Sequence, residues 1–398
     1  MSAPNKTPTR NNALDGVRGY AALAVGIYHS ILCLHNSNAV EQFLKTPLHD
    51  NPNLYHFVTK LLLVIFNGET AVILFFILSG AVLFASLQSA IQKKSLLKCT
   101  TDFIIARLFR IYPALIICLI CFFVAFLLLN KLNPVFFSFS IEQLFHNLIL
   151  YKPEAMHGAT WTLQIEIVAV PFILVSFYLY HRLGIWGGII SFIYMALAIK
   201  LKFLVFYHPT LAGCLYYFVL GFAMTTPQAK YVFSKINGKI APVALIALLM
   251  TGHIGYGLTP LSFLVKGFFA FIFVGIIFYK RSVLFDRFLT HRIAEYFGKI
   301  SYSVYLFNLI FIDIALCMLT KLPSVTERYL EAGMVIALFS LIVTLPVAHC
   351  VEKYIEQPCI RLGRWVQNIK LPISVLSPQP SAESARALIQ EIYPFPQQ

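Results

Sequence analysis

Residues 61–87 read LLLVIFNGETAVILFFILSGAVLFASL and carry one charged side chain, Glu69. About 20 apolar residues are enough for a helix to cross the hydrocarbon core of a bilayer, so this stretch predicts a transmembrane helix. The same character extends along the chain of 398 residues, of which 59% are hydrophobic and 12% are charged. A soluble domain carries roughly 25% charged residues. The composition therefore excludes a soluble globular protein and predicts an all-α, polytopic membrane protein.

About ten apolar stretches are expected to cross the membrane, joined by loops in which Lys and Arg gather. The predicted spans are approximately 14–34, 61–87, 108–129, 161–180, 184–205, 210–225, 240–257, 260–279, 300–320 and 331–350. The basic loop residues are Lys93, Lys94, Lys98, Lys230, Lys235, Lys239, Lys280, Arg281, Arg287, Arg292, Lys353, Arg361, Arg364 and Lys370. Ten spans place these residues on one side, and because cytoplasmic loops are enriched in Lys and Arg, both termini are predicted to be cytoplasmic.

The chain is expected to form one membrane body over 14–363. A cytoplasmic segment, 1–13, precedes it, and a cytoplasmic tail, 364–398, follows it and is predicted to be partly disordered because it is polar and rich in Pro, Ser and Gln. The net charge of +14 is explained by the basic loops, so the expected partner is the lipid bilayer and not nucleic acid. Several of the eight Cys lie within apolar runs, where Cys behaves as a small hydrophobic residue, and no metal site is expected.

Few ionisable side chains lie inside the predicted spans, and each is a candidate functional residue because a charge in the bilayer is costly unless it is paired or hydrated. They are Asp15, Arg18, His29, Glu69, Glu166, Lys266 and Asp313. At about 1.5 Å of rise per residue, the histidine and three of the carboxylates are expected at a similar depth in the outer half of the membrane. These are His29, Glu69, Glu166 and Asp313.

One histidine near a carboxylate suits a general base whose imidazolium is oriented and stabilised by an anion. We therefore expect His29 to be the base, with Glu166 as its carboxylate and Glu69 as the alternative. A core histidine bonded to a neighbour remains an equally open interpretation of His29. A structural role in a buried ion pair is equally open for Lys266 and Asp313.

Three arginines predict a place for phosphate groups near the cytoplasmic edge. Arg18 and His29 are eleven residues apart, which returns them to nearly the same face of a helix with about 16 Å of rise between them. Arg107 and Arg110 are three residues apart and share a face of the third span. Forked guanidinium groups bind phosphate well, although an isolated pair of this kind is also typical of membrane anchoring. A ligand with phosphates near the cytoplasm and a reactive end about 16 Å deeper has the shape of an acyl-coenzyme A, which is one of several possibilities that these residues leave open.

Six short motifs resemble those of the acyltransferase 3 family of integral-membrane O-acyltransferases, and they occur in that family's order. They are LDGVRGYAAL at 14–23 with His29 completing Arg-x10-His, FFILSG at 75–80, RLFRIYP at 107–113, WTLQIE at 161–166, SYSVYL at 301–306 and EQP at 356–358. The resemblance covers residues 14–363. It departs from the family at Asn308, where a His is usual, at Ile167, where a second Glu is common, and at Ile73, where an acidic residue is usual.

The resemblance implies a membrane body of about ten helices that transfers an acyl group, most simply acetyl, from cytoplasmic acyl-CoA to a hydroxyl of a sugar or cell-envelope glycan. It implies that His29 is the essential histidine and that Arg107 and Arg110 bind the donor, with Arg18 at the entrance. Tyr302 is a further expected donor-binding residue. The location implied is a bacterial cytoplasmic membrane. A secondary transporter or a lipid-linked sugar flippase, using the same polar residues as a pathway, is the alternative function.

Overall fold

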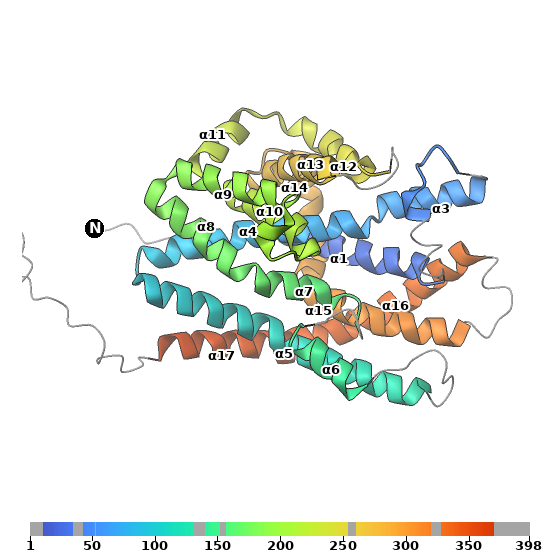
Figure 1. The fold of residues 1–398 in the computed structure, drawn as a ribbon. Helices are drawn as coiled ribbons and strands as arrows, with labels where there is room; N and C mark the ends of the chain where they lie inside the picture. Colours follow the sequence, from blue (N-terminus) through green and yellow to red (C-terminus); the bar gives the residue numbers. More distant parts are fainter. Residues whose placement is uncertain are drawn as a thin grey trace, which may run out of the picture.

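A computed structural model describes residues 11–34, 43–51, 53–130, 140–151, 157–253, 260–319 and 328–369. In this part of the chain every regular element is helical, as the sequence predicts. Most of the long helices run in roughly the same direction and form one bundle, with α1 inside it and α5 and α17 side by side along one edge (Figure 1). The expected N-terminal segment and the tail beyond residue 369 lie outside the described residues, apart from 11–13.

The helices follow one another along the chain. They are α1 (Asn12–Leu32), α3 (Leu54–Ile65), α4 (Gly68–Ile91), α5 (Leu96–Asn130), α6 (Ile141–Leu148), α7 (Thr160–Val168), α8 (Val170–Leu183), α9 (Ile185–Ala198), α10 (Pro209–Ala223), α11 (Pro227–Lys235), α12 (Ala241–Met250), α13 (Pro260–Phe278), α14 (Val283–Leu289), α15 (Arg292–Leu319), α16 (Tyr329–Val351) and α17 (Gln357–Asn368). Two 3₁₀ turns, η2 (Lys202–Val205) and η3 (Gly238–Ile240), and a π-helical turn, η4 (Glu352–Glu356), complete the described elements.

The number of membrane-crossing helices differs from the predicted ten. Among the described residues, six helical segments are long and apolar enough to cross a membrane, and a seventh is possible if α10 and α11, bent by 79°, form one span. The six are Leu54–Ile91, Leu96–Asn130, Thr160–Leu183, Leu261–Phe278, Arg292–Leu319 and Tyr329–Asn368. The predicted spans 14–34, 184–205 and 240–257 have no counterpart in this set.

The physical reason differs among these three spans. The helices α9 and α12 have 14 and 10 residues, and at about 1.5 Å per residue neither reaches across a hydrocarbon core of roughly 30 Å. Residues 254–257 of the predicted span 240–257 lie outside the described residues. Helix α1 has 21 residues, but it contains Asp15, Arg18 and His29 and is surrounded by other helices. A helix that is packed inside a bundle does not need a continuous apolar surface.

Glycines allow the helices around the centre of the bundle to approach closely. A Cβ atom added to Gly298 of α15 would lie 2.2 Å from the carbonyl oxygen of Asp15 in α1, and one added to Gly19 would lie 2.6 Å from the nitrogen of Gly298. Similarly, Gly80 of α4 and Gly221 of α10 each lie against the other helix's backbone. Small residues at such crossings are the usual means of packing helices in a membrane. Because Gly19 is next to Arg18, this contact also fixes the backbone position of Arg18.

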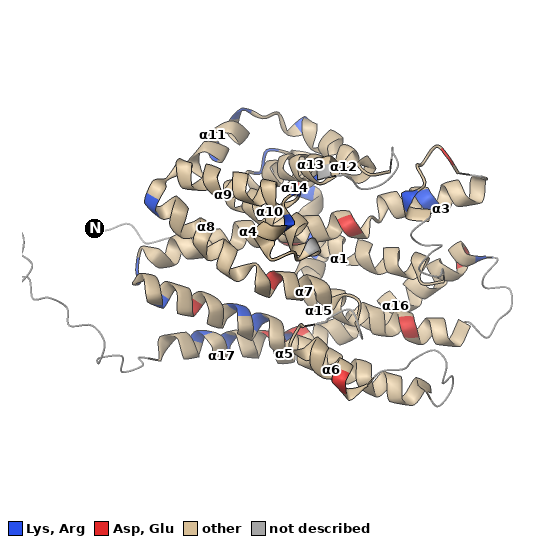
Figure 2. Cartoon of the chain, viewed as in Figure 1, with Lys and Arg blue, Asp and Glu red and all other residues tan. Residues whose placement is uncertain are grey.

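The two ends of the bundle differ in charge. Lys and Arg gather on the end where α5 begins and α17 finishes, while acidic residues are scattered further along the helices (Figure 2). This distribution agrees with the expected position of the C-terminal part of the chain on the basic side. By the positive-inside rule that side is expected to face the cytoplasm.

Candidate active site

A cavity of about 440 Å³ opens at the basic end of the bundle and runs between α4, α5, α7, α15 and α17. Its lining on α4 extends from Val72 to Ala90, which corresponds to roughly 27 Å along the helix axis. Five Lys or Arg side chains and two carboxylates line it, so its net charge is +3 at neutral pH. They are Arg18, Lys94, Arg107, Arg110, Arg364, Asp102 and Glu166. A long, narrow and positively charged cavity of this volume is suited to an elongated anionic ligand.

The three arginines predicted from the sequence meet in the middle of this cavity. Arg18 from α1 interacts electrostatically with Arg110 from α5, and Arg110 does so with Arg107. Among the described residues, neither Arg18 nor Arg110 donates a hydrogen bond to another side chain or carbonyl, and both line the cavity. Guanidinium groups that face a cavity without a protein acceptor are available to a phosphate. The structure thus brings these three sequence-predicted residues together in one cavity.

Arg107 differs from the other two arginines because its guanidinium group already binds groups of the protein. Its Nη2 atom lies 3.1 Å from Oε2 of Glu166 and donates to the backbone oxygen of Glu166 at 3.2 Å. The Arg107 side chain is 6% exposed. This pair fastens α7 to α5, and Glu166 is thereby placed beside the arginines.

Glu356 is an acidic neighbour of the arginines that the sequence analysis named only as part of a motif. It lies in the π-helical turn η4, accepts a short hydrogen bond from Ser303 Oγ, and interacts electrostatically with Arg110 and Arg18. Pro358 follows two residues later, and because proline has no N–H to donate, the regular α-helical pattern is interrupted here. The turn directs Glu356 towards the bundle interior, where its side chain counterbalances the arginines.

Tyr302 lines the cavity as expected, but its hydroxyl group is occupied. It donates to the backbone oxygen of Ile111 in α5 at 2.8 Å. The hydrogen bond connects α15 to α5 one turn beyond Arg107. Tyr302 therefore contributes the face of its ring to the cavity wall, while its hydroxyl group holds the two helices together.

The deep end of the cavity is closed by aromatic and hydroxyl side chains. Tyr305 accepts a hydrogen bond from Thr162 Oγ1 at 3.0 Å and donates to the backbone oxygen of Ala159 at 3.1 Å. Its ring packs edge-on against Phe75, with ring centroids 5.8 Å apart. Thr162, Phe75 and Tyr305 all line the cavity.

His29 lies beyond this closed end. It is partly buried on α1 and is not among the described residues that line the cavity. A Cβ atom at Gly68 would lie 2.7 Å from the neighbouring Tyr28 ring, so the start of α4 is level with this part of α1. Val72, the lining residue of α4 that is farthest from the basic end, is four residues further on. The end of the cavity therefore lies roughly 6–8 Å from His29 along the bundle axis, towards the basic end.

His157 is a buried histidine that the sequence analysis did not single out. Its ring and that of His29 are close enough to interact electrostatically. His157 Nδ1 accepts from the Ala159 N–H at 3.2 Å, so Nε2 carries the proton and donates to the Leu306 backbone oxygen at 2.8 Å. With both nitrogens occupied, His157 holds the start of α7 against α15 and is not free to accept a proton. No sequence pattern indicated that His157 is buried, because this residue lies in a connection outside the predicted spans.

The predicted carboxylate partners of His29 lie elsewhere in the structure. Glu166 is held by Arg107, at the level of Arg18 and so roughly 16 Å below His29 along α1. The expected match in depth is therefore wrong for Glu166. The cause is that residues 157–159 are already inside the bundle when α7 begins at Thr160, whereas the prediction assumed a helix that starts at the membrane surface.

Glu69 lies at the level of His29 but is paired with a lysine. Its Oε2 is 2.5 Å from Nζ of Lys266, whose side chain is 1% exposed. Nearby, Asn67 Nδ2 lies 2.7 Å from Nε2 of His253. Lys266 is thus the buried member of an ion pair, and its partner Glu69 is 37% exposed.

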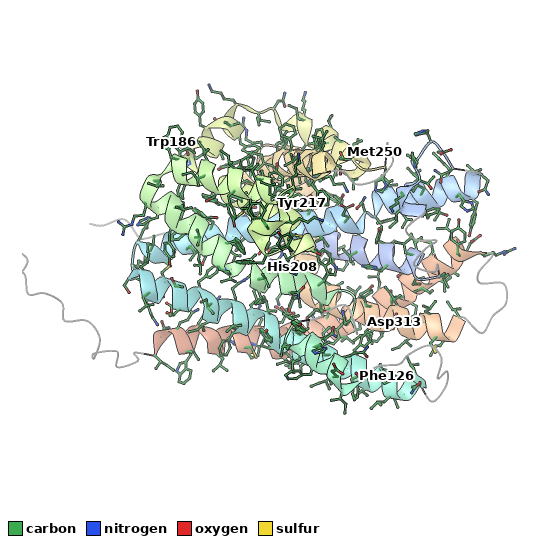
Figure 3. All side chains as sticks on the ribbon, viewed as in Figure 1. Phe126, Trp186, His208, Tyr217, Met250 and Asp313 are labelled. Carbon is green, nitrogen blue, oxygen red and sulfur yellow. The ribbon has the colours of Figure 1, made fainter. Side chains whose placement is uncertain are left out.

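Asp313 lies on α15 towards the end of the bundle away from α17 (Figure 3). It interacts electrostatically with Cys33, one turn beyond His29. The structure therefore keeps Asp313 in the outer half of the bundle near the end of α1, as its depth in the sequence predicts, but no hydrogen bond between Asp313 and His29 occurs among the described side chains. In the part of the chain that the structure describes, no group of three His, Cys, Asp or Glu is arranged to hold a metal ion.

Comparison with known proteins assigns the chain to a family. The acyltransferase 3 family model, described as an acyltransferase domain, matches residues 11–351. No curated protein and no solved structure matches the chain. The matched region contains α1 to α16, and hence the arginines, Glu166, Tyr302 and His29. The chain therefore belongs to the acyltransferase 3 family and is a multi-pass membrane protein with an acyltransferase domain.

Proposed function

We propose that this protein transfers an acyl group, most simply acetyl, from cytoplasmic acyl-CoA to a hydroxyl of a sugar or cell-envelope glycan in a bacterial cytoplasmic membrane. The observation that carries the proposal is the cavity itself, which is positively charged and open at the basic end of the bundle. Family membership favours acyl transfer over the alternative of a transporter or flippase. The donor and the acceptor are our inference.

The charge of the cavity fits the phosphates of coenzyme A. Arg18 and Arg110 face the cavity without protein acceptors, and Arg107 adds a third positive charge that Glu166 partly neutralises. A diphosphate bound here would receive charge-assisted hydrogen bonds from forked guanidinium groups. Acyl-CoA is the common acyl donor that combines such a diphosphate with a long, thin arm.

The length of the pantetheine arm fits the distance to His29. The arm contains about 13 consecutive bonds between the sulfur and the first phosphate, equivalent to four to five residues of extended chain, or about 15 Å. The rise from Arg18 to His29 along α1 is about 16 Å. With the diphosphate at the arginines, the thioester therefore comes level with the imidazole. For it to reach His29, the Phe75 and Tyr305 rings that close the cavity must separate.

In the proposed reaction His29 accepts the proton of the acceptor hydroxyl, whose oxygen attacks the thioester carbonyl carbon. A carbon–oxygen bond forms and the carbon–sulfur bond breaks, and the proton passes from the imidazolium to the leaving CoA thiolate. General base catalysis of this kind requires the base to lie within hydrogen-bonding distance of the hydroxyl, directly or through one water. A carboxylate that stabilises the imidazolium, either Glu166 or Glu69 in the original prediction, would have to leave its present basic partner, so the neutral imidazole alone is the simpler base.

The acceptor is expected to approach from the outer end of the bundle, because the donor cavity opens at the basic end. The test is mass spectrometry of envelope glycans from cells that express the protein or its His29→Ala variant. A gain in mass of one acetyl group that depends on His29 is expected. Purified protein in lipid nanodiscs should also release free CoA from acetyl-CoA only when acceptor glycan is added. Glycan transport without acyl-CoA and without covalent change would instead support the transporter alternative.

A further inference from the structure

Two basic side chains besides the three arginines line the cavity towards its mouth. We infer that these two, Lys94 and Arg364, bind the 3′-phosphate of the donor nucleotide. Both residues line the cavity and both are exposed. This inference rests on the proposed acyl-CoA donor and adds a subsite that selects CoA over the same molecule without its 3′-phosphate. The motifs that identify the family do not include either residue.

The mouth is built by the start of α5 and the end of α17. Gln367 donates from Nε2 to the backbone oxygen of Asp102 at 2.7 Å, and Lys98 donates from Nζ to the backbone oxygen of Gln367 at 2.6 Å. Gly363 packs directly against Phe109, because a Cβ there would lie 2.8 Å from the Phe109 Cβ. Figure 2 shows the basic residues of α5 and α17 beside one another at this end of the bundle. The position of Arg364 relative to α5 is therefore fixed by contacts on both sides of it.

The charged side chains at the mouth of the cavity have a net positive charge, which favours the binding of an anion. Asp102 is the only carboxylate among the described residues that line the mouth, and it is shared by Lys94 at 2.5 Å and Lys98 at 3.0 Å. Two ammonium groups on one carboxylate leave a net positive charge. Arg364 adds another, since no described residue forms an ion pair or hydrogen bond with its guanidinium group. A phosphate dianion is the ligand that best matches two such groups.

The spacing matches the donor. Asp102, which pairs with Lys94, precedes Arg107 and Arg110 by five and eight residues on α5, or roughly 8–12 Å along the axis. Arg364 follows Gly363, which packs against Phe109, so its backbone lies nearer the level of the arginines, on the α17 side of the cavity. In acyl-CoA the ribose 3′-phosphate lies on the far side of the diphosphate from the pantetheine arm. With the arm pointing towards His29 and the diphosphate at the arginines, the 3′-phosphate is directed to Lys94 and Arg364.

The test compares acetyl-CoA with acetyl-dephospho-CoA, which lacks only the 3′-phosphate. For the wild-type protein in nanodiscs we expect KM to be about tenfold lower for acetyl-CoA, as loss of a charge-assisted hydrogen bond predicts. In Arg364→Gln, and separately in Lys94→Gln, KM for acetyl-CoA should rise towards the value for the dephospho donor, while KM for that donor stays unchanged. The matched controls are Arg361→Gln and Lys93→Gln, which are exposed neighbours that do not line the cavity.

The inference would be overturned if the wild-type protein had nearly equal KM values for acetyl-CoA and acetyl-dephospho-CoA. It would also be overturned if the ratio of these two KM values were unchanged in both variants. Equal increases of KM for both donors would overturn it too, because they would mean that these cations hold a lipid headgroup or shape the mouth. Equilibrium binding of CoA and dephospho-CoA to the purified protein gives the same comparison without turnover. Preferential binding of CoA that is lost in Arg364→Gln, together with no acyl transfer, would reject the proposed function and keep the subsite.

Discussion

Arg107 and Glu166 form an ion pair, with 3.1 Å between Nη2 and Oε2, that joins α5 to α7 in the wall of the cavity. The same guanidinium group also binds the backbone oxygen of Glu166. Two predicted functional residues thus neutralise each other in part, and the pair has a structural role in addition to any contact with substrate. This relationship separates Arg107 from Arg110, although the sequence presents them as equivalent members of one motif.

Removing one partner of this pair should be more harmful than removing both. We expect Arg107→Gln to lower the melting temperature markedly, because breaking a buried pair leaves an uncompensated charge and costs up to about 3–5 kcal/mol. Arg107→Gln combined with Glu166→Gln should recover much of that stability. Thermal unfolding in detergent, followed for both single variants and the double variant, measures the coupling. Additive effects would show that the pair contributes no coupling.

Arg110→Gln should affect donor binding and leave stability nearly unchanged, since Arg110 is exposed to the cavity and has no acceptor among the described residues. KM for acetyl-CoA is expected to rise about tenfold with little change in kcat, as loss of a phosphate contact predicts. Steady-state kinetics in nanodiscs makes this measurement. A fall in melting temperature as large as that of Arg107→Gln, with KM unaltered, would mean that Arg110 is an anchor.

His29→Ala should abolish acyl transfer and keep the fold. Loss of a general base typically lowers the rate by about 100- to 10,000-fold. The matched control is His49→Ala, which removes an exposed histidine that does not line the cavity. Acetyl transfer and the melting temperature are measured for both variants. Near-normal transfer by His29→Ala would end its assignment as the base.

Glu69 and Lys266 should behave as one structural unit. Glu69→Gln leaves the ammonium group of Lys266 buried without its carboxylate, so a clear loss of stability is expected. Adding Lys266→Met should restore stability. If the double variant also retains acyl transfer, Glu69 is not the carboxylate that assists His29; a stable double variant without transfer would support the original alternative assignment of Glu69.

Gly298→Ala should force α1 away from α15. The added Cβ would lie 2.2 Å from the carbonyl oxygen of Asp15, a backbone atom that cannot move without its helix. Overpacking of this kind typically costs about 1–3 kcal/mol, and here it also displaces Arg18. Gly158→Ala is the control, because nothing lies within 4 Å of its added Cβ. We expect Gly298→Ala alone to lower both the melting temperature and donor binding.

Residue patterns predicted the convergence of Arg18, Arg107 and Arg110, because helical periodicity puts each on a definite face and the basic loops indicate which ends face the cytoplasm. They failed for Glu166, since depth was counted from a membrane surface that α7 never reaches. They also failed for the number of spans, because a central helix such as α1 can carry Asp15, Arg18 and His29 and still be buried by its neighbours. No local pattern marked Arg364, which reaches the cavity through the contact of α17 with α5.

The amino-acid sequence by itself determined that this is an all-helical membrane protein with a basic face and a histidine about 16 Å from an arginine on one helix. These properties depend on composition and on the repeat of the α-helix, which are local. Only the tertiary structure decided which carboxylate neutralises which cation, where the cavity ends and which buried histidine interacts electrostatically with His29. Such pairings depend on contacts between helices distant in the chain, made possible by glycines such as Gly19 and Gly298 that let backbones touch.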